Sequence, residues 1–130
     1  NQGLYSPVQA SSRIYSSQDI ERWHINEMKS LLSRFSGVKF IFDDVKQKYY
    51  PVLRDAITSF RSKNEGKPLV VIDDTPFIDF DILDYPVNDI EEIFLLKGSD
   101  AAIWGPKASN GIIVIITQRG KSTKTEQKEE

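Results

Sequence analysis

Two short, wholly apolar runs near the C-terminal end constrain the fold more than any other feature of the chain. The first run is Ile93–Leu96 and the second is Ile112–Ile116. Turn-forming residues bound them, with Gly98 after the first run and Asn110 and Gly111 before the second. Continuous apolar runs of this length are typical of strands that are buried on both faces of a sheet. The sequence therefore predicts two central, fully buried strands.

The polar insert between these runs predicts a short helix. Ser99 stands where an N-cap is expected, and Gly105 follows the last residue of the predicted helix. Pro106 should then prevent the helix from continuing. Strand, short helix and strand would together form a compact βαβ-like unit on which the rest of the domain packs. We expect Gly105 and Gly111 to need the backbone freedom of glycine.

The first part of the chain predicts a short strand, two helices and a second strand. The first strand should lie within residues 12–16, and Ser17 and Asn26 should cap the two helices. Gly37 should end the second helix, and residues 38–42 should form the second strand. The second helix is marked by apolar residues at helical spacing: Met28, Leu31, Leu32 and Phe35.

Residues 69–73 predict a third buried strand, because they read Leu-Val-Val-Ile-Asp. Asp73 and Asp74 should then form a turn, since Asp is a common turn residue. A weak helix near Ile82 and a helical turn capped by Asn88 should follow. This stretch would bring the chain back to the first of the two apolar runs.

The predicted fold class is α+β, with a small mixed β-sheet flanked by short helices. At 130 residues the chain is long enough for one domain with a single core. We expect residues 1–11 to be a linker or arm, 12–120 to be the domain and 121–130 to be a disordered polar tail. The start at Asn1, without a signal peptide, predicts a processed or excised fragment. The central strands are predicted at 69–73, 92–97 and 111–118.

The titratable residues do not form a catalytic pattern. One histidine and no cysteine exclude a His/Cys metal cluster built from this chain. Asp73 and Asp74 follow an apolar strand, as metal-binding carboxylates of α/β enzymes often do, but a turn explains them more simply. A net charge of −2 does not indicate the excess of positive charge that is typical of nucleic-acid-binding proteins. We therefore predict no enzyme activity, no cofactor, no metal site and no nucleic-acid partner.

Four stretches of the chain occur in an order that one family of domains shares. They are Ser17-Gln-Asp-Ile-Glu through Leu31-Leu32 and Gly37-Val38; Pro68-Leu-Val-Val-Ile-Asp-Asp; Leu-Lys-Gly followed by Ala-Ala-Ile-Trp-Gly; and Ala-Ser-Asn-Gly followed by a strand ending Ile-Thr-Gln-Arg-Gly. Together they cover about residues 12–120. They resemble the plug domain of TonB-dependent outer-membrane receptors, in particular the SusC/RagA type of glycan and peptide importers.

Residues 45–67 allow two interpretations. Helical spacing, with Pro51 at the first helical position, favours a helix. The resemblance instead implies an extended segment, in which Leu53, Arg54 and Asp55 match an Ile-Arg-Gly element whose glycine is replaced here. The register of the other stretches favours the extended interpretation slightly. The apolar residues that support the helix are Leu53, Ala56, Ile57 and Phe60.

The resemblance implies a role in transport. Plug domains of this family sit inside the transmembrane β-barrel of the same polypeptide, on the periplasmic side of the outer membrane, and TonB remodels them to open a path. The runner-up hypothesis is a plug-like envelope module without a barrel, which binds proteins or ligands and forms a homodimer through its sheet edges when isolated. A third hypothesis is a hydrolase or phosphotransferase that uses Asp73 and Asp74 with a divalent metal.

Trp104 is the one ligand-binding candidate, because an aromatic face suits stacking on a sugar ring. A Trp at the end of a short helix more often serves as a packing anchor, and we favour that interpretation. The remaining motif residues are predicted to be structural: Gly37, Arg54, Asp73, Gly98, Gly105, Asn110 and Gly111.

Overall fold

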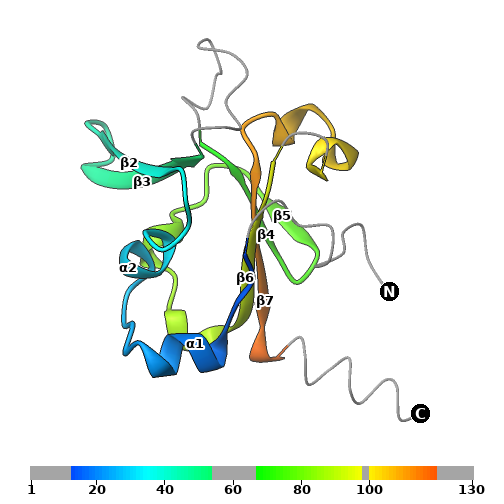
Figure 1. Cartoon of the computed structure of the whole chain (residues 1–130). Helices are drawn as coiled ribbons and strands as arrows, with labels where there is room; N and C mark the ends of the chain where they lie inside the picture. The colour runs from blue at the N-terminus through cyan, green and yellow to red at the C-terminus, as the bar shows by residue number, and fades with distance from the viewer. Residues whose placement is uncertain (1–12, 54–66, 98–99, 120–130) are drawn as a thin grey trace.

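A computed structural model describes residues 13–53, 67–97 and 100–119, which form two sheets and several short helical turns (Figure 1). The larger sheet contains β1 (Tyr15–Ser16), β4 (Leu69–Ile72), β5 (Thr75–Phe77), β6 (Ile90–Leu96) and β7 (Ile112–Thr117). The smaller sheet is a hairpin of β2 (Val38–Asp43) and β3 (Lys48–Leu53). The predicted α+β class with a small mixed sheet is confirmed.

The five-stranded sheet has the strand order β1-β6-β7-β4-β5. β4 and β7 are parallel, whereas the other neighbours are antiparallel. The predicted βαβ-like unit is therefore wrong in one respect, because β6 and β7 run in opposite directions. Apolar runs indicate burial on both faces but carry no information about strand direction. The three predicted central strands are confirmed, although β6 begins at Ile90 rather than near residue 92.

The side chains of the central strands contribute to two apolar clusters, one on each face of the sheet. Alternate residues of a strand point to opposite faces. Ile93 and Leu95 join the cluster beneath α1 (Ser17–Arg22) and α2 (Met28–Leu32), whereas Phe94 and Leu96 join a second cluster on the other face. Fully burying one such side chain contributes about 1.5–3 kcal/mol. These strands are therefore the most strongly fixed part of the domain.

The N-cap of each helix lies one residue away from its predicted position. Ser16 caps α1 in place of Ser17: the Asp19 backbone N–H donates to Ser16 Oγ (3.4 Å), and the Ser16 N–H donates to Asp19 Oδ2 (2.9 Å). Ser16 also ends β1, where it pairs with Glu92, so its backbone is already extended as an N-cap requires. Glu27, not Asn26, precedes α2 and makes no side-chain cap hydrogen bond.

α2 ends at Leu32, earlier than its apolar spacing predicts. Phe35 is buried in the turn that follows, with its ring 4.7 Å from that of Tyr15. Gly37, at φ 85°, lies at the end of this turn, directly before β2, and does not end the helix itself. The apolar periodicity therefore located a buried segment correctly but overestimated its helical length.

The extended interpretation of the middle segment is confirmed as far as Leu53. β3 is extended over Lys48–Leu53, so the helix beginning at Pro51 is wrong. Pro51 pairs with Phe40 of β2, in a two-stranded ribbon where a missing N–H on the outer edge is tolerated. Leu53 is the last described residue of the predicted Ile-Arg-Gly element, and Arg54 and Asp55 lie outside the described ranges.

The predicted turn after β4 is confirmed. Asp73 and Asp74 have φ angles of 49° and 71° and connect β4 to β5 as a two-residue hairpin loop. Positive φ at both positions is typical of the turn that best matches the twist of a hairpin, and Asp tolerates it better than most residues. The Asp73 carboxylate also accepts hydrogen bonds from the Thr117 backbone N–H (3.0 Å) and hydroxyl (2.5 Å), which ties the end of β4 to the end of β7.

Short 3-10 helices lie in the connections on either side of β6. η3 (Ile82–Asp84) and η4 (Val87–Asp89) precede β6, and Asn88 lies inside η4 rather than capping it. Between β6 and β7, η6 (Ala102–Trp104) and η7 (Pro106–Ala108) are separated by Gly105. Pro106 starts η7, because the fixed φ of proline suits the first residue of a helical turn. The predicted cap Ser99 lies outside the described residues.

Within the described ranges, the helices are all too short and too polar to span a membrane.

Candidate functional site

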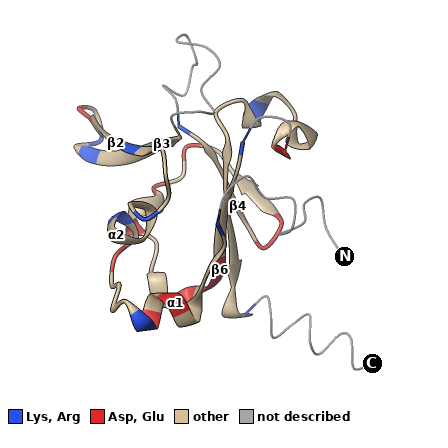
Figure 2. Ribbon diagram, viewed as in Figure 1, with Lys and Arg blue, Asp and Glu red and all other residues tan. Residues whose placement is uncertain are grey.

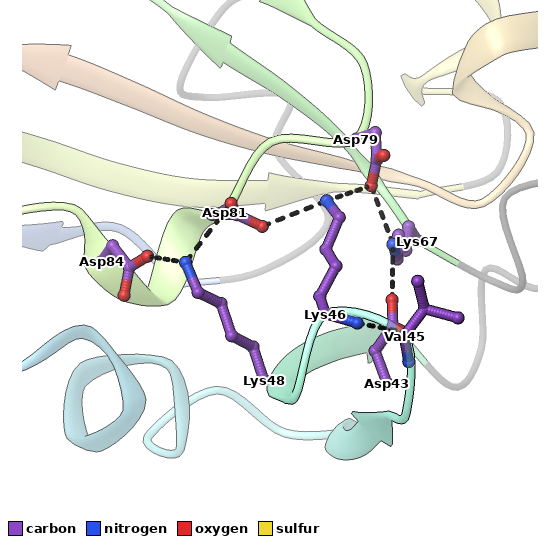
Figure 3. A network of polar contacts seen from close by, with 8 residues as sticks. All are labelled: Asp43, Val45, Lys46, Lys48, Lys67, Asp79, Asp81 and Asp84. Atoms are coloured by element: carbon purple, nitrogen blue, oxygen red, sulfur yellow. Dashed lines mark hydrogen bonds and ion pairs between the residues drawn. The ribbon is translucent and has the colours of Figure 1, made fainter.

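Charged side chains gather where the outer end of the β2–β3 hairpin meets the connection between β5 and β6. Figure 2 shows basic residues on the hairpin close to acidic residues of its tip and of the neighbouring connection. Seven of these residues form a continuous series of contacts, drawn in Figure 3, which we call the ion-pair chain. Its members are Asp43, Lys46 and Lys48 of the hairpin, Lys67 before β4, and Asp79, Asp81 and Asp84 of the connection.

Positive and negative charges alternate along the ion-pair chain without interruption. Each of its three lysines lies between two carboxylates. The Nζ-to-oxygen distances are 2.7 Å for Lys48–Asp84, 3.6 Å for Lys48–Asp81, 3.3 Å for Lys46–Asp81, 3.2 Å for Lys46–Asp79, 2.7 Å for Lys67–Asp79 and 3.4 Å for Lys67–Asp43. Four of these six pairs join the hairpin directly to the connection that carries η3.

The backbone fixes the position of several groups of the ion-pair chain. Asp43 closes β2, and its Oδ1 accepts hydrogen bonds from the backbone N–H groups of Val45 (2.9 Å) and Lys46 (3.3 Å). Gln47 and Asp79 both have positive φ, at 57° and 58°. Such backbone conformations are uncommon outside glycine and persist where the surrounding contacts fix them. The charged groups are therefore presented by a defined backbone.

The ion-pair chain runs from a sheltered end to an exposed end. The side chain of Lys67 is 15% exposed, whereas that of Asp84 is 62% exposed. The hydrogen bond from Lys67, aided by one from Lys46, lowers the pKa of Asp79 below its ordinary value. The pKa of Asp43 is lowered first by the backbone hydrogen bond from Lys46 and further by Lys67. Both carboxylates are therefore charged at neutral pH.

The pKa values of the three lysines shift in the opposite direction and are raised. The pKa of Lys46 is raised by its hydrogen bond to Asp79, and that of Lys48 by its hydrogen bond to Asp84. Partial burial alone would lower the pKa of Lys67, but the hydrogen bonds and charges of Asp79 and Asp43 outweigh burial, so the pKa is raised. In each member of the ion-pair chain whose pKa shifts, the shift therefore stabilises the charged form of the side chain.

An open cavity of about 200 Å³ lies against the exposed end of the ion-pair chain. Its wall includes Lys29, whose ammonium lies 4.6 Å from the ring centre of Tyr49 and 5.5 Å from that of Phe40. These cation–π contacts add a further link between α2 and the hairpin. The residues lining the cavity are Glu27, Lys29, Lys48, Tyr49, Asp81, Leu83 and Asp84.

Trp104, the predicted ligand candidate, lies inside the second apolar cluster. Its side chain is 8% exposed and packs with Ala101 and Ala108 of the turns around it. Among the described residues its indole N–H has no hydrogen-bond partner. A ligand role for Trp104 stays a prediction, and it would require the ring to become exposed. The neighbouring Ile103 is the exposed apolar side chain of this turn.

The predicted structural residues fall at separate places in the fold. Gly105 and Gly111 have φ angles of 83° and 91°. Asn110 is buried, and its Nδ2 donates to the Lys67 carbonyl oxygen (3.3 Å), so it supports the base of the ion-pair chain. Gly98, like Arg54, lies outside the described residues. Asp73 binds Thr117, and in the described part of the chain no group of three or more metal-ligating side chains gathers around it or elsewhere.

The sequence-based predictions did not include the ion-pair chain. None of its seven members is assigned a functional role by the sequence alone. The usable signal is that residues 43–48, Asp-Asp-Val-Lys-Gln-Lys, and residues 79–84, Asp-Phe-Asp-Ile-Leu-Asp, each place like charges two or three residues apart. Complementary spacing of this kind can match across two segments once they are known to be neighbours.

Comparison with known families decides what kind of domain this is. The model of the family described as TonB-dependent Receptor Plug Domain matches residues 6–112. The chain belongs to this family. The predicted plug-domain family is therefore confirmed at the level of the family.

Solved receptor structures contain the same fold as this plug domain. An enterobactin-bound mutant of the ferric enterobactin receptor from Pseudomonas aeruginosa matches 87% of the chain with a TM-score of 0.64 and 18% identity. The siderophore receptor PirA from Acinetobacter baumannii matches 82% of it with a TM-score of 0.63 and 20% identity. The matched region covers 18% and 17% of those two receptors, so the plug domain spans less than a fifth of their length.

Proposed function

We propose that this plug domain closes the lumen of a TonB-dependent outer-membrane receptor and gates the uptake of a nutrient. The family match over residues 6–112 carries the proposal. A barrel of many strands encloses more space than its own side chains can fill, so a separate folded domain is needed to close it. In this proposal the barrel belongs to the same polypeptide as the plug.

The division of the fold into two sheets supports a gating role. A gate must contain a part that keeps its shape and a part that can change. The five-stranded sheet, with apolar clusters on both faces, suits the first requirement. The ion-pair chain joins the hairpin to the connection between β5 and β6 through exposed charges, and such contacts are easier to break than apolar packing. The hairpin therefore suits the second requirement.

We further propose that the receptor is of the SusC/RagA type, which imports glycans or peptides. The support is the order of four sequence stretches between residues 12 and 120, including Ala-Ala-Ile-Trp-Gly and Ala-Ser-Asn-Gly. The solved structures with the same fold are named as a ferric enterobactin receptor and a siderophore receptor. At 18–20% identity they support the fold of this chain but not its cargo. Uptake assays with glycans, peptides and ferric siderophores would separate these cargo classes.

The remaining partners follow from the same proposal. TonB would engage the chain from the periplasmic side of the outer membrane and remodel the plug. When isolated, the domain could instead pair with a second copy through a sheet edge. Both edge strands are short, and β5 contains Pro76, which cannot donate a backbone hydrogen bond. Sedimentation of the isolated domain at several concentrations would test whether such a dimer forms.

Fractionation of native cells, probed with an antibody against this domain, tests the proposal directly. We expect a band much heavier than 14.9 kDa that stays in the outer-membrane fraction and is released only by detergent. A soluble or peripheral periplasmic band of about the size of this chain would overturn the proposal. That result would instead support the plug-like module without a barrel.

A further inference from the structure

The β2–β3 hairpin is attached to the rest of the domain in two chemically different ways. Its inner end is apolar, because Val52 and Leu53 are buried beside the main sheet. Its outer end is polar, and the contacts there are those of the ion-pair chain and the cation–π contact of Lys29 with Tyr49. Among the described strands, no backbone pairing joins the hairpin to the five-stranded sheet. The docked position of the outer end therefore depends on side-chain charges.

We propose that the ion-pair chain is a latch, which holds the outer end of the hairpin against the connection between β5 and β6 and lets the hairpin swing away as a unit when the charges are screened or removed. The latch is a property of this chain by itself. Only its use in opening a transport path rests on the proposed function.

The arrangement of the charges makes the latch sensitive to ionic strength. At low salt, opposite charges separated by 2.7–3.6 Å attract one another across the junction. The screening length falls from about 10 Å at 0.1 M salt to about 3 Å at 1 M, which weakens exposed pairs far more than apolar contacts. Because Lys46 and Lys48 each bridge two carboxylates, the loss of either ammonium removes two contacts at once.

The hairpin has the internal contacts it needs to move as one body. β2 and β3 pair in continuous register from Val38–Leu53 to Asp43–Lys48. The rings of Phe42 and Tyr49 also pack edge to face across the two strands, with centres 5.1 Å apart. These contacts lie within the hairpin and do not depend on the latch. Gly37, at φ 85° directly before β2, provides a backbone position where the direction of the chain can change.

A distance measurement across the junction tests the latch. The sequence contains no cysteine, so spin labels can be attached specifically to Val45→Cys at the hairpin tip and Ile103→Cys between β6 and β7. Val45 is 92% exposed and Ile103 is also exposed, so neither label disturbs a core. Pulsed electron paramagnetic resonance on the 130-residue chain should give one narrow distance distribution at 0.05 M NaCl. At 1 M NaCl a second, longer population should appear.

Two variants separate the latch from general loosening of the domain. Lys46→Gln with Lys48→Gln removes four of the six pairs and should produce the longer population already at 0.05 M NaCl. Arg119→Gln removes an ion pair to Asp89 (3.1 Å), away from the hairpin, and should leave the distances unchanged. Hydrogen exchange of the β6 and β7 amides should remain slow in both variants.

Unchanged distances in the double variant and at high salt would overturn the latch. Faster exchange of β6 and β7 together with the longer distances would also overturn it, because the hairpin would then not move independently of the sheet. Neither outcome depends on whether a barrel surrounds the domain, so the latch and the proposed function fail in distinguishable ways.

Discussion

The five-stranded sheet and the β2–β3 hairpin use opposite means to hold a strand in place. In the sheet, β6 and β7 are buried on both faces and apolar packing fixes them. In the hairpin, Phe42 and Tyr49 remain exposed, and charged side chains fix the outer end. Apolar packing resists salt and pH, whereas ion pairs respond to both. One small domain thus combines a part whose packing changes little with salt and pH and a part whose attachment depends on both.

Removing one large ring from each region should reveal the greatest difference between them. Phe94→Ala creates a cavity in the second apolar cluster, where the side chain is fully buried, and should lower the free energy of unfolding by about 3–5 kcal/mol. Phe42→Ala, at a ring that is 43% exposed, should cost about 1 kcal/mol or less. Urea denaturation measures both, and equal losses would show that the hairpin is as tightly built as the sheet.

A smaller effect should appear at the turn that separates η6 from η7. Gly105 has φ 83° and ψ −169°, a region that is essentially restricted to glycine, although an added Cβ would meet no atom within 4 Å. Gly105→Ala should therefore lower the free energy of unfolding by about 1–3 kcal/mol through the backbone alone.

Chirality supplies the control for Gly105. D-alanine, introduced at this position by chemical ligation, has the same volume as L-alanine but prefers the mirror-image backbone region. Thermal unfolding should show D-alanine close to wild type and L-alanine well below it. If both residues destabilise equally, a steric clash rather than the backbone conformation is responsible.

The hydrogen bond between Thr117 and Asp73, which links the ends of β7 and β4, should contribute a comparable or somewhat smaller amount to the free energy of unfolding. Thr117→Val keeps the shape of the buried side chain but removes the hydroxyl that donates to Asp73. The free energy of unfolding should fall by about 1–3 kcal/mol, because Asp73 loses one of its two hydrogen bonds from Thr117. Asp74→Asn alters the adjacent turn residue without touching this bond and is the matched control for chemical denaturation.

The smallest predicted effect is the pH dependence of the latch. Because the pKa values of Asp43 and Asp79 are lowered by folding, their contribution is complete above the ordinary value of 3.8 and is lost as pH falls through their folded values. Because the pKa values of Lys46, Lys48 and Lys67 are raised, their contribution is complete below 10.5 and is lost at higher pH.

The hairpin should therefore stay docked between about pH 5 and pH 9, and the label distances should change only outside this range. Among the described residues, the other charged groups that line the adjoining cavity are Glu27 and Lys29, and the single histidine does not line it. A transition near pH 6–7 would contradict this expectation. Salt, rather than pH, is then the practical way to release the latch in the neutral range.

Features set by neighbouring residues were predictable from the sequence. The strands β4 and β7 contain the continuous apolar runs Leu69–Ile72 and Ile112–Ile116, and the turn at Asp73 and Asp74 has local turn chemistry. The cap of α1 was misplaced because Ser16 owes its extended backbone to pairing with Glu92, far along the chain. Pro51 was ambiguous for the same reason, since only its pairing with Phe40 selects a strand over a helix.

The candidate site depended wholly on such distant pairings. Viewed along the sequence, Lys46 and Lys48 are ordinary solvated charges on a loop, and Asp79, Asp81 and Asp84 are equally ordinary. Their alternation appears only when the hairpin lies against the connection before β6. Local patterns report burial and turns well, but they do not report which two polar segments will face each other.

The alternating order of the ion-pair chain also determines how the domain appears to a solute at a distance. Three ammonium groups and four carboxylates leave one net negative charge on seven ionised residues. Beyond the spacing between neighbouring charges, their fields largely cancel, and the remainder decays within about 10 Å at 0.1 M salt. A charged molecule passing this surface would therefore be neither attracted nor repelled strongly. The opposite charges therefore attract one another strongly at contact distance, but they produce only a weak electrostatic field farther away.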